Sequence, residues 1–221
     1  MEEHGLTFPT IPGLPVHTSF MIYSSVLLII FSFIVRGSLA LVPGKLQNIV
    51  EYIIEGFSRL AEDMMGHKGK AYLPLVLTLF LYILVSNSFG LFPTLVPPTA
   101  NLNTTLALAL MVFILTHIVG LKEHGFAYIK HFLGPMPILA PIMFPIEVFG
   151  HLARPVSLSM RLFGNIFGHE LLVFSILGLM PYAYPLLAFV TVLGVLTVVI
   201  QAFIFSLLTM AYLGGAIEEA H

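Results

Sequence analysis

Five long apolar stretches constrain the fold of this chain more than any other feature of its sequence. They lie at about Thr18–Val35, Tyr72–Phe92, Leu102–Val119, Leu139–Met180 and Tyr184–Ile217. About 20 predominantly apolar residues are enough for a helix to cross the hydrocarbon core of a bilayer. In lipid every backbone polar group needs an internal partner, so such stretches form helices rather than open sheets. The sequence therefore predicts an all-α polytopic membrane protein with about five membrane-spanning helices.

The composition supports this class and excludes several others. Of the 221 residues, 58% are hydrophobic and only 9% are charged, whereas soluble domains carry about 25% charged residues. The net charge of −2 argues against a nucleic-acid partner. Because the chain has no cysteine, it has no disulfide framework, no thiolate nucleophile and no cysteine-based metal site. The acidic start Met1-Glu2-Glu3 lacks the basic region of a cleaved signal peptide, so we expect the first apolar stretch to be retained.

One segment has a helical pattern of a different kind. Apolar residues recur at helical spacing on one face of residues 45–65, and charged or amide side chains fill the other face; the apolar set is Leu46, Val50, Ile53, Phe57, Leu60 and Met64. This pattern is typical of an amphipathic helix that lies along the membrane interface. A cytoplasmic helix packed on the protein's own loops would have the same pattern, and the sequence does not separate the two.

We expect a single integral membrane domain over residues 1–221. Residues 1–40 would form an N-terminal tail and the first span, 45–65 the interfacial helix, 71–120 the second and third spans, and 139–217 a long hairpin. Each arm of this hairpin is longer than an upright span requires, so it either tilts or kinks, and Pro141, Pro145 and Pro155 would permit a kink. Pro181 and Pro185 mark the turn between the arms.

Basic residues predict the orientation. Five fall in or near the loop after the first span, and two fall in the loop after the third span; these are Arg36, Lys45, Arg59, Lys68 and Lys70, then Lys122 and Lys130. By the positive-inside rule the N-terminus is outside and the C-terminus is in the cytoplasm. Arg161 is the basic residue that this scheme is least able to place at a membrane face.

Arg161 is energetically unusual because a guanidinium cannot be neutralised by losing its proton. Placing it in lipid would cost at least about 2.5–3.5 kcal/mol. At about 100° per residue, Glu147, Arg154, Ser157 and Asn165 fall within roughly 40° of Arg161, and His151 and His169 flank this polar stripe. Glycines on the same side would let a neighbouring helix approach closely. The stripe is either an ion path or a structural polar seam.

Glu170 and Gln201 are the other conspicuous polar residues. Glu170 lies on about the opposite face from Arg161, so it is not a local salt-bridge partner. It could exchange a proton, together with adjacent His169, or be a protonated acid bound to a backbone carbonyl. Gln201, in the last stretch, lies level with Arg161 in an antiparallel hairpin. Its amide carbonyl could accept from the guanidinium, or it could belong to a packing seam.

Other functional classes have less support. His169-Glu170 begins like a zinc-protease helix, but Val173 replaces the second histidine, and there is no phosphate-binding glycine loop or nucleophile elbow. A secondary transporter that binds an anionic substrate through Arg161 is the alternative function. Such transporters commonly contain internal repeats and more spans, neither of which this short chain shows.

Two motifs carry a family resemblance. The run SLSMRLFGNIFGHELL from Ser157 closely resembles the signature of subunit a of the F-type ATP synthase, the membrane stator subunit of its Fo sector. The segment IQAFIF from Ile200, followed by Leu208-Thr209 and Tyr212-Leu213, resembles the last helix of that family. Asn87–Pro93 and Asn101–Asn103 are also similar, so the resemblance covers most of the chain.

The resemblance implies a non-catalytic, proton-translocating subunit without cofactors in the bacterial plasma (inner) membrane. Its implied partners are a c-ring, peripheral-stalk b subunits and, indirectly, the catalytic head. Arg161 matches the essential arginine that faces the ion-binding carboxylates of the rotating c-ring. The positions lining or abutting the outer half-channel and the arginine are matched by Ser157, Asn165, Glu170 and Gln201. Glu147 matches a carboxylate associated with the inner half-channel.

The chain departs from the family pattern at Gly194. Several bacterial relatives place a histidine there, on the last helix, as the partner of the acid that Glu170 matches. Either water fills the space at Gly194 or His169 substitutes from the neighbouring helix. The choice between proton and sodium lies largely in the binding site of the ring, and we expect the proton.

Overall fold

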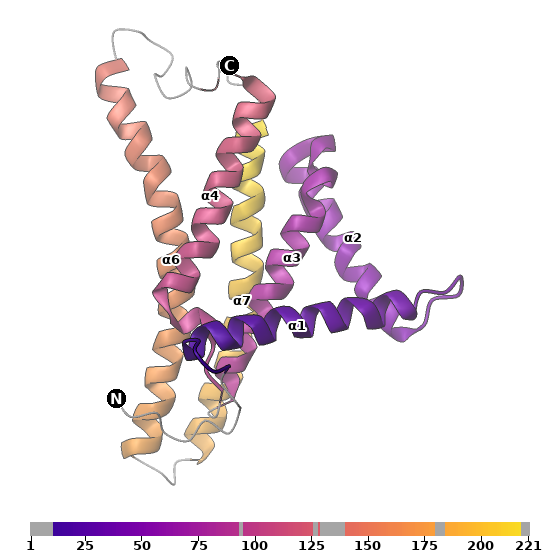
Figure 1. Cartoon of the computed structure of the whole chain (residues 1–221), viewed down its shortest axis with the longest axis vertical. Coiled ribbons are helices and arrows are strands. Elements are labelled where there is room, and N and C mark those ends of the chain that lie inside the picture. The colour runs from indigo at the N-terminus through magenta and orange to yellow at the C-terminus, as the bar shows by residue number, and fades with distance from the viewer. Residues whose placement is uncertain (1–10, 93–94, 126–127, 129–139, 180–183, 218–221) are drawn as a thin grey trace.

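The computed structural model describes residues 11–92, 95–125, 128, 140–179 and 184–217. Every regular element in these ranges is a helix (Figure 1). The long helices are α1 (Val16–Gly37), α2 (Lys45–Met65), α3 (Gly69–Ser88), α4 (Leu102–His124), α6 (Ala140–Leu179) and α7 (Tyr184–Ile217). Three short 3-10 helices join them: η1 (Gly66–Lys68), η2 (Phe89–Leu91) and η3 (Pro98–Ala100). Five helical segments are long and apolar enough to cross a membrane, which confirms the predicted all-α membrane class.

The helix boundaries agree with the sequence patterns, with small differences. α1, α2 and α7 begin and end within two residues of the predicted segments. The second span is shifted, because α3 already begins at Gly69 and ends at Ser88, where η2 takes over. The third span is longer than predicted, since α4 continues to His124. Pro185 belongs to the first turn of α7, where a proline needs no N–H partner; Pro181 lies outside the described residues.

Local signals explain where several helices begin and end. The Asn101 side chain accepts a 2.9 Å hydrogen bond from the Asn103 N–H and so caps the start of α4. α2 and α4 end at Gly66 and Gly125, whose φ angles of 62° and 55° lie in a region that L side chains rarely adopt. α6 continues through Pro145 and Pro155. The arm is thus one continuous helix of 40 residues, longer than an upright span requires.

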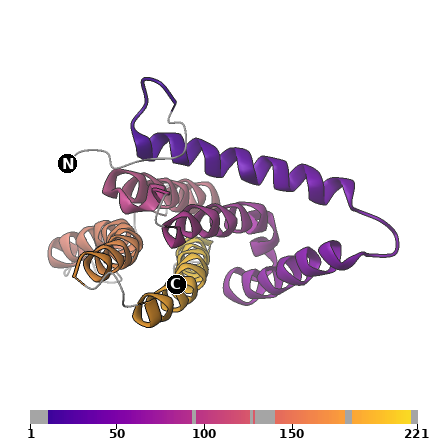
Figure 2. The same ribbon diagram turned by 90° about the horizontal axis from the view of Figure 1, so that it is seen from below.

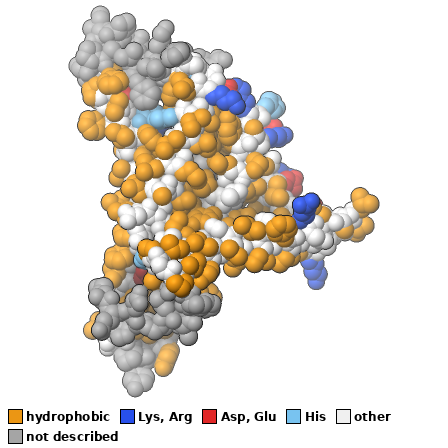
Figure 3. Space-filling model, in the orientation of Figure 1, with side chains coloured by type: hydrophobic (Ala, Val, Ile, Leu, Met, Phe, Trp, Pro, Cys, Tyr) orange, Lys and Arg blue, Asp and Glu red, His pale blue; other side chains and the backbone are white. Residues whose placement is uncertain are grey.

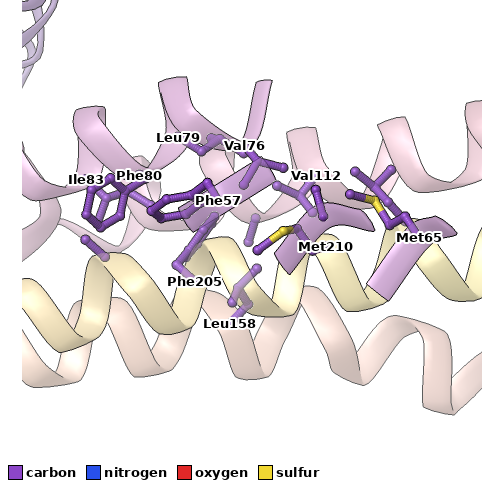
Figure 4. Packing of buried hydrophobic residues seen from close by; sticks show 14 of the residues in the cluster. Phe57, Met65, Val76, Leu79, Phe80, Ile83, Val112, Leu158, Phe205 and Met210 are labelled. Atoms are coloured by element: carbon purple, nitrogen blue, oxygen red, sulfur yellow. The ribbon is translucent and has the colours of Figure 1, made fainter. Parts of the chain in front are cut away.

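α7 lies at the centre of the bundle and contacts α2, α3, α4 and α6 (Figures 1 and 2). Its C-terminal half supplies much of the core, including Phe205, Met210 and Leu213, which are fully buried. Figure 4 shows Phe205 and Met210 in one buried cluster with Val76 and Phe80 of α3 and Leu158 of α6. The N-terminal half of α7 instead exposes large apolar residues such as Val192 and Leu196. The hairpin is therefore anchored in the protein at one end and uncovered over the rest.

α2 packs against α3 and α7 rather than on loops. The ring of Phe57 lies 4.8 Å from that of Phe80 and 6.0 Å from that of Phe203. The N-terminal half of α2 is different, since Ile49 and Tyr52 are 62% and 80% exposed. The predicted apolar face packs on the core at Ile53, Phe57, Leu60 and Met64, whereas Leu46 at its start is 40% exposed. An interfacial position would place the exposed residues in contact with lipid head groups.

Polar side chains in the apolar helices are satisfied locally or face other helices. Ser24, Thr116, Ser206 and Thr209 each donate to the carbonyl four residues earlier, at 2.8 to 3.0 Å. Such back-bonding keeps a hydroxyl group paired where no water is present. The polar segment at the end of α3 faces inward: Ser86 Oγ donates to Ser24 Oγ at 3.2 Å, and Asn87 Oδ1 accepts from Thr99 at 2.7 Å.

Charged side chains gather along one edge of the molecule, around α2 and the neighbouring helix ends (Figure 3). Ion pairs form there, among them Lys68 with Glu123 of α4 and Lys70 Nζ with Glu62 at 3.4 Å. α1 crosses the directions of α6 and α7 at a wide angle (Figure 1). These helices cannot all stand parallel to one membrane normal. If α1 is upright in the bilayer, the α6–α7 hairpin is strongly inclined.

Candidate functional site

α6 carries most of the polar residues that the sequence singled out. It packs against α4 and α7 and stands at the edge of the bundle (Figure 1). Leu158, Leu162 and Ile166 follow one another at a spacing of four residues and are at most 3% exposed. Because this row faces the core, the orientation of the helix is determined, and residues on the opposite side point out of the described fold. Arg161 lies on that outer side.

Arg161 is exposed, as are the nearby Ser157 and Gly164. Within the described part of the chain, no hydrogen bond or ion pair involves its guanidinium. A charged group in a membrane-spanning helix normally faces a partner or water rather than lipid. Its guanidinium is therefore open to a partner or to water outside the described residues.

Three glycines leave this side of α6 accessible to another helix. A Cβ atom added at Gly150, Gly164 or Gly168 would meet no atom within 4 Å. Small residues allow helix backbones to approach closely in a membrane. The predicted glycine stripe is thus open rather than used for packing within the described fold.

Asn165 connects the polar stripe to α7. Its side-chain Nδ2 donates a 2.7 Å hydrogen bond to Oε1 of Gln201, which is 2% exposed. The prediction that Gln201 lies level with this part of α6 is correct in register. The carbonyl oxygen of Gln201 accepts from Asn165, and no hydrogen bond joins Gln201 to Arg161. Arg161 points outward while Gln201 is buried in the hairpin.

Glu170 lies nine residues after Arg161, about 13 Å along the helix axis. Its side chain is half-buried and makes no ion pair among the described residues. The structure thus agrees with the prediction that it does not pair with Arg161. The adjacent His169 ring packs directly over Gly194 of α7, since a Cβ atom there would collide with Nε2 of the imidazole. We expected either water or His169 to fill the space beside Gly194, and His169 fills it.

At the other end of the stripe, Glu147 lies about 21 Å from Arg161 along α6. Its Oε1 is 3.2 Å from Nε2 of His151, one helical turn away. His151 is 6% exposed, so it faces the bundle rather than the outer side. A carboxylate and an imidazole at this distance can exchange a proton.

Two residues near this end of α6, His117 and Tyr128, were not predicted as site residues. The His151 ring lies 5.4 Å from the ring of His117 on α4, and the Tyr128 hydroxyl lies 3.2 Å from Nδ1 of His117. His117 is therefore hydrogen-bonded to Tyr128 and packed beside His151. Nothing in the sequence indicated that the two histidines meet, because that depends on how α4 packs against α6.

Tyr128 keeps its proton near neutral pH. Burial raises the pKa of its hydroxyl, although the positive charge of Arg154 acts in the opposite direction. The phenol can therefore donate to Nδ1 of His117. The guanidinium of Arg154 lies 5.5 Å from the ring centroid of Tyr212, which ties it to α7. In the part of the chain that the structure describes, no group of three or more histidine or acidic side chains could hold a metal ion.

Comparison with known proteins identifies the family. The family model described as ATP synthase A chain matches residues 18–214. ATP synthase subunit a of Geobacter sulfurreducens is 53% identical over 196 residues, which cover 89% of this chain and 85% of that protein. ATP synthase subunit a 3 of Pelobacter propionicus is 53% identical over 88% of this chain and 84% of its own length. ATP synthase subunit a 1 of Syntrophotalea carbinolica is 48% identical over 95% of this chain and 88% of its own. The chain therefore belongs to the ATP synthase A chain family and is a membrane subunit of the Fo sector.

Proposed function

We propose that this chain translocates protons as the stator subunit of Fo and couples their flow to rotation of a c-ring. The observation that carries the proposal is the position of Arg161. It is an exposed cation on a membrane-spanning helix, it has no partner among the described residues, and open glycines lie beside it. A ring of carboxylates that moves past this face would supply the missing charge, one carboxylate at a time.

The two ends of α6 would serve two separate aqueous half-channels. On the outer side, protons would enter past Glu170, His169, Asn165 and Gln201, next to Ser157, and reach a ring carboxylate. On the inner side, they would leave near Glu147. These two acids are separated by about 34 Å along the helix axis, so no direct transfer connects them. Rotation of the ring would carry each proton between the half-channels.

Arg161 would act as a fixed charge barrier. Its guanidinium favours the ionised form of the ring carboxylate that faces it, and it repels a proton that would otherwise pass straight from one half-channel to the other. Each proton that crosses 100 mV releases about 2.3 kcal/mol. Without the barrier, this energy would be lost as a leak rather than converted to rotation.

The chain would have no catalytic site of its own, because ATP chemistry would belong to the catalytic head. The exposed outer side of α6 and the uncovered half of α7 would face the c-ring. Peripheral-stalk b subunits and lipid would contact the remaining exposed surfaces. The charged edge would face the cytoplasm of a bacterial cell, and by the positive-inside rule the N-terminus would lie outside and the C-terminus inside.

Replacing Arg161 tests the proposal. In assembled enzyme, Arg161→Ala should abolish proton-driven ATP synthesis and ATP-driven pumping. Arg161→Lys should fail or be severely impaired, since a desolvated ammonium group loses its proton more readily than a guanidinium. Arg59→Ala is the matched control, because Arg59 is an exposed arginine of α2 paired with Glu55 at 2.6 Å. Normal synthesis by assembled Arg161→Ala enzyme would overturn the proposal.

Two further measurements separate the alternatives. A stator subunit should purify together with a c-ring and stalk, whereas a secondary transporter should purify alone. ATP synthesis that proceeds at the same rate without added sodium supports the proton, and an absolute requirement for sodium would contradict that part of the proposal.

A further inference from the structure

Four titratable side chains form a continuous row from α6 to α4 and beyond. Glu147 Oε1 lies 3.2 Å from Nε2 of His151, whose ring lies 5.4 Å from that of His117. Nδ1 of His117 is in turn 3.2 Å from the hydroxyl oxygen of Tyr128. Each side chain in the row can both accept and release a proton.

The row is enclosed by protein in its middle and more accessible at the carboxylate. The side chains of Glu147 and His151 are 33% and 7% exposed. Beside the imidazoles is a cavity of about 10 Å³, lined in part by Thr116, His117, His151 and Arg154. This volume approaches the space that one water molecule needs, and the lining offers several polar partners.

The charges around the row favour passage of a proton rather than its storage. Among the described residues, the titratable and charged groups near the two imidazoles include Glu147 and Arg154 of α6, Tyr128, and Tyr212 of α7, whose ring lies 5.5 Å from the Arg154 guanidinium. Arg154 lies one turn from His151. Its positive charge therefore repels the positive charge that either imidazole gains when it is protonated. A proton that arrives from Glu147 would therefore move on.

The position of the row relative to the charged edge gives the direction of transfer. His117 precedes Glu123 by six residues, about 9 Å along α4. Glu123 pairs with Lys68 at the edge where charged side chains gather. The row thus runs from Glu147 on α6, across the contact between α4 and α6, toward the charged edge. The positive-inside rule assigns this edge to the cytoplasm.

From this geometry we infer that His151 and His117 relay protons between Glu147 and the inner side of the membrane. The inference rests on the proposed function and extends its inner half-channel. In each step one proton moves: the carboxylic acid of Glu147 gives its proton to Nε2 of His151. His151 releases a proton from Nδ1 toward His117 through the water-sized cavity, and His117 then releases one toward the Tyr128 end. Only N–H and O–H bonds change. Each transfer leaves the imidazole as its other tautomer, and rotation of the ring or proton exchange through a water molecule restores the starting tautomer before the next proton passes.

A structural explanation makes a different prediction. If the row only joins α4 to α6, glutamine should replace histidine well, because its amide retains hydrogen bonding without titrating near neutral pH. The test therefore uses His151→Gln and His117→Gln singly, in complete ATP synthase whose assembly is checked by co-purification of its subunits. Phe113→Leu is the packing control, since the Phe113 ring lies 4.3 Å from that of His117 but carries no proton.

The readout is passive proton flux through Fo in inverted vesicles stripped of the catalytic head and driven by a potassium diffusion potential. The medium then bathes the cytoplasmic side, and its pH is varied from about 6 to 8, the range in which histidine titrates. We expect each glutamine variant to lower the flux about tenfold and to flatten its dependence on this pH. Phe113→Leu should retain the wild-type pH profile.

Two results would overturn the relay. One is a wild-type flux and pH profile in both assembled glutamine variants. The other is an equal loss in Phe113→Leu, which would assign the effect to packing. Arg161→Ala, measured in parallel for coupled synthesis, separates this inference from the proposed function. If Arg161→Ala abolishes coupling while the glutamine variants are normal, only the relay is wrong; if it leaves coupling intact, the proposed function itself fails.

Discussion

The side-chain amide of Asn165 on α6 donates a 2.7 Å hydrogen bond to the carbonyl oxygen of Gln201 on α7. This bond joins the two arms of the hairpin one turn from Arg161. Asn165 is exposed on the arginine side, whereas Gln201 is buried against the core. The pair therefore fixes the outer surface around Arg161 to the interior of the bundle.

Removing the acceptor at position 201 should weaken the hairpin. Gln201→Leu is expected to lower the thermal stability of the assembled complex by about 1–3 kcal/mol, because the Asn165 amide loses its partner. Gln201→Glu is the matched variant, since a carboxylate can still accept from Asn165. Thermal inactivation of the purified enzyme measures both. Equal losses in the two variants would show that the hydrogen bond is not what position 201 contributes.

A methyl group at Gly194 should move the imidazole of His169. A Cβ atom there collides with the far end of this flexible side chain, so Gly194→Ala is expected to displace the ring at only a small cost in stability. Proton uptake from the outer side should slow at the same time. Gly178→Ala is the control, because its Cβ meets nothing within 4 Å.

Exchanging the two residues tests the same contact from the other side. In Gly194→His with His169→Gly, an imidazole from α7 can occupy the space that the α6 imidazole leaves. We expect proton uptake in this double variant to recover relative to Gly194→Ala. Failure to recover in an assembled enzyme would show that the helix carrying the imidazole matters, and not only its position.

The carboxyl group of Glu170 should be needed for the rate of uptake. Glu170→Gln keeps the size and polarity of the side chain but cannot exchange a proton, so ATP synthesis should fall about tenfold or more. Asp63→Asn, an exposed acid on α2, is the control and should leave synthesis unchanged. Synthesis rates are compared over a range of outer-side pH. If Glu170→Gln retains the normal rate and pH profile, its role is structural.

Adjacent glycines near the end of α7 should respond in opposite ways. A Cβ atom at Gly214 collides with the carbonyl oxygen of Met64 on α2, so Gly214→Ala should separate the two helices and lower stability by about 1–3 kcal/mol. Gly215 has nothing within 4 Å, and Gly215→Ala should be neutral or stabilise α7 by up to about 1 kcal/mol. Thermal unfolding of the two variants in the same detergent provides the comparison. Similar effects at both positions would argue against close α2–α7 packing.

The sequence predicted the helices well because each membrane-spanning segment must satisfy its own backbone hydrogen bonds. α7 begins and ends where the apolar run does, and α2 matches its amphipathic pattern. The predicted helix ends were less accurate in two situations. One is a change from α-helix to 3-10 helix, and the other is an α-helix that continues past its apolar run into polar residues. The end of α3 at η2 and the extension of α4 to His124 are the examples.

The sequence by itself determined the all-α membrane class, the polar stripe on α6 and the anomalous position of Arg161, since these follow from composition and from the helical repeat. Only the tertiary structure decided which polar groups meet. Asn165 rather than Arg161 reaches Gln201, His169 fills the space over Gly194, and His151 meets His117 of α4. These contacts depend on the rotation and register of one helix against another. Those are set by the core packing of α4, α6 and α7 and not by the periodicity of any single segment.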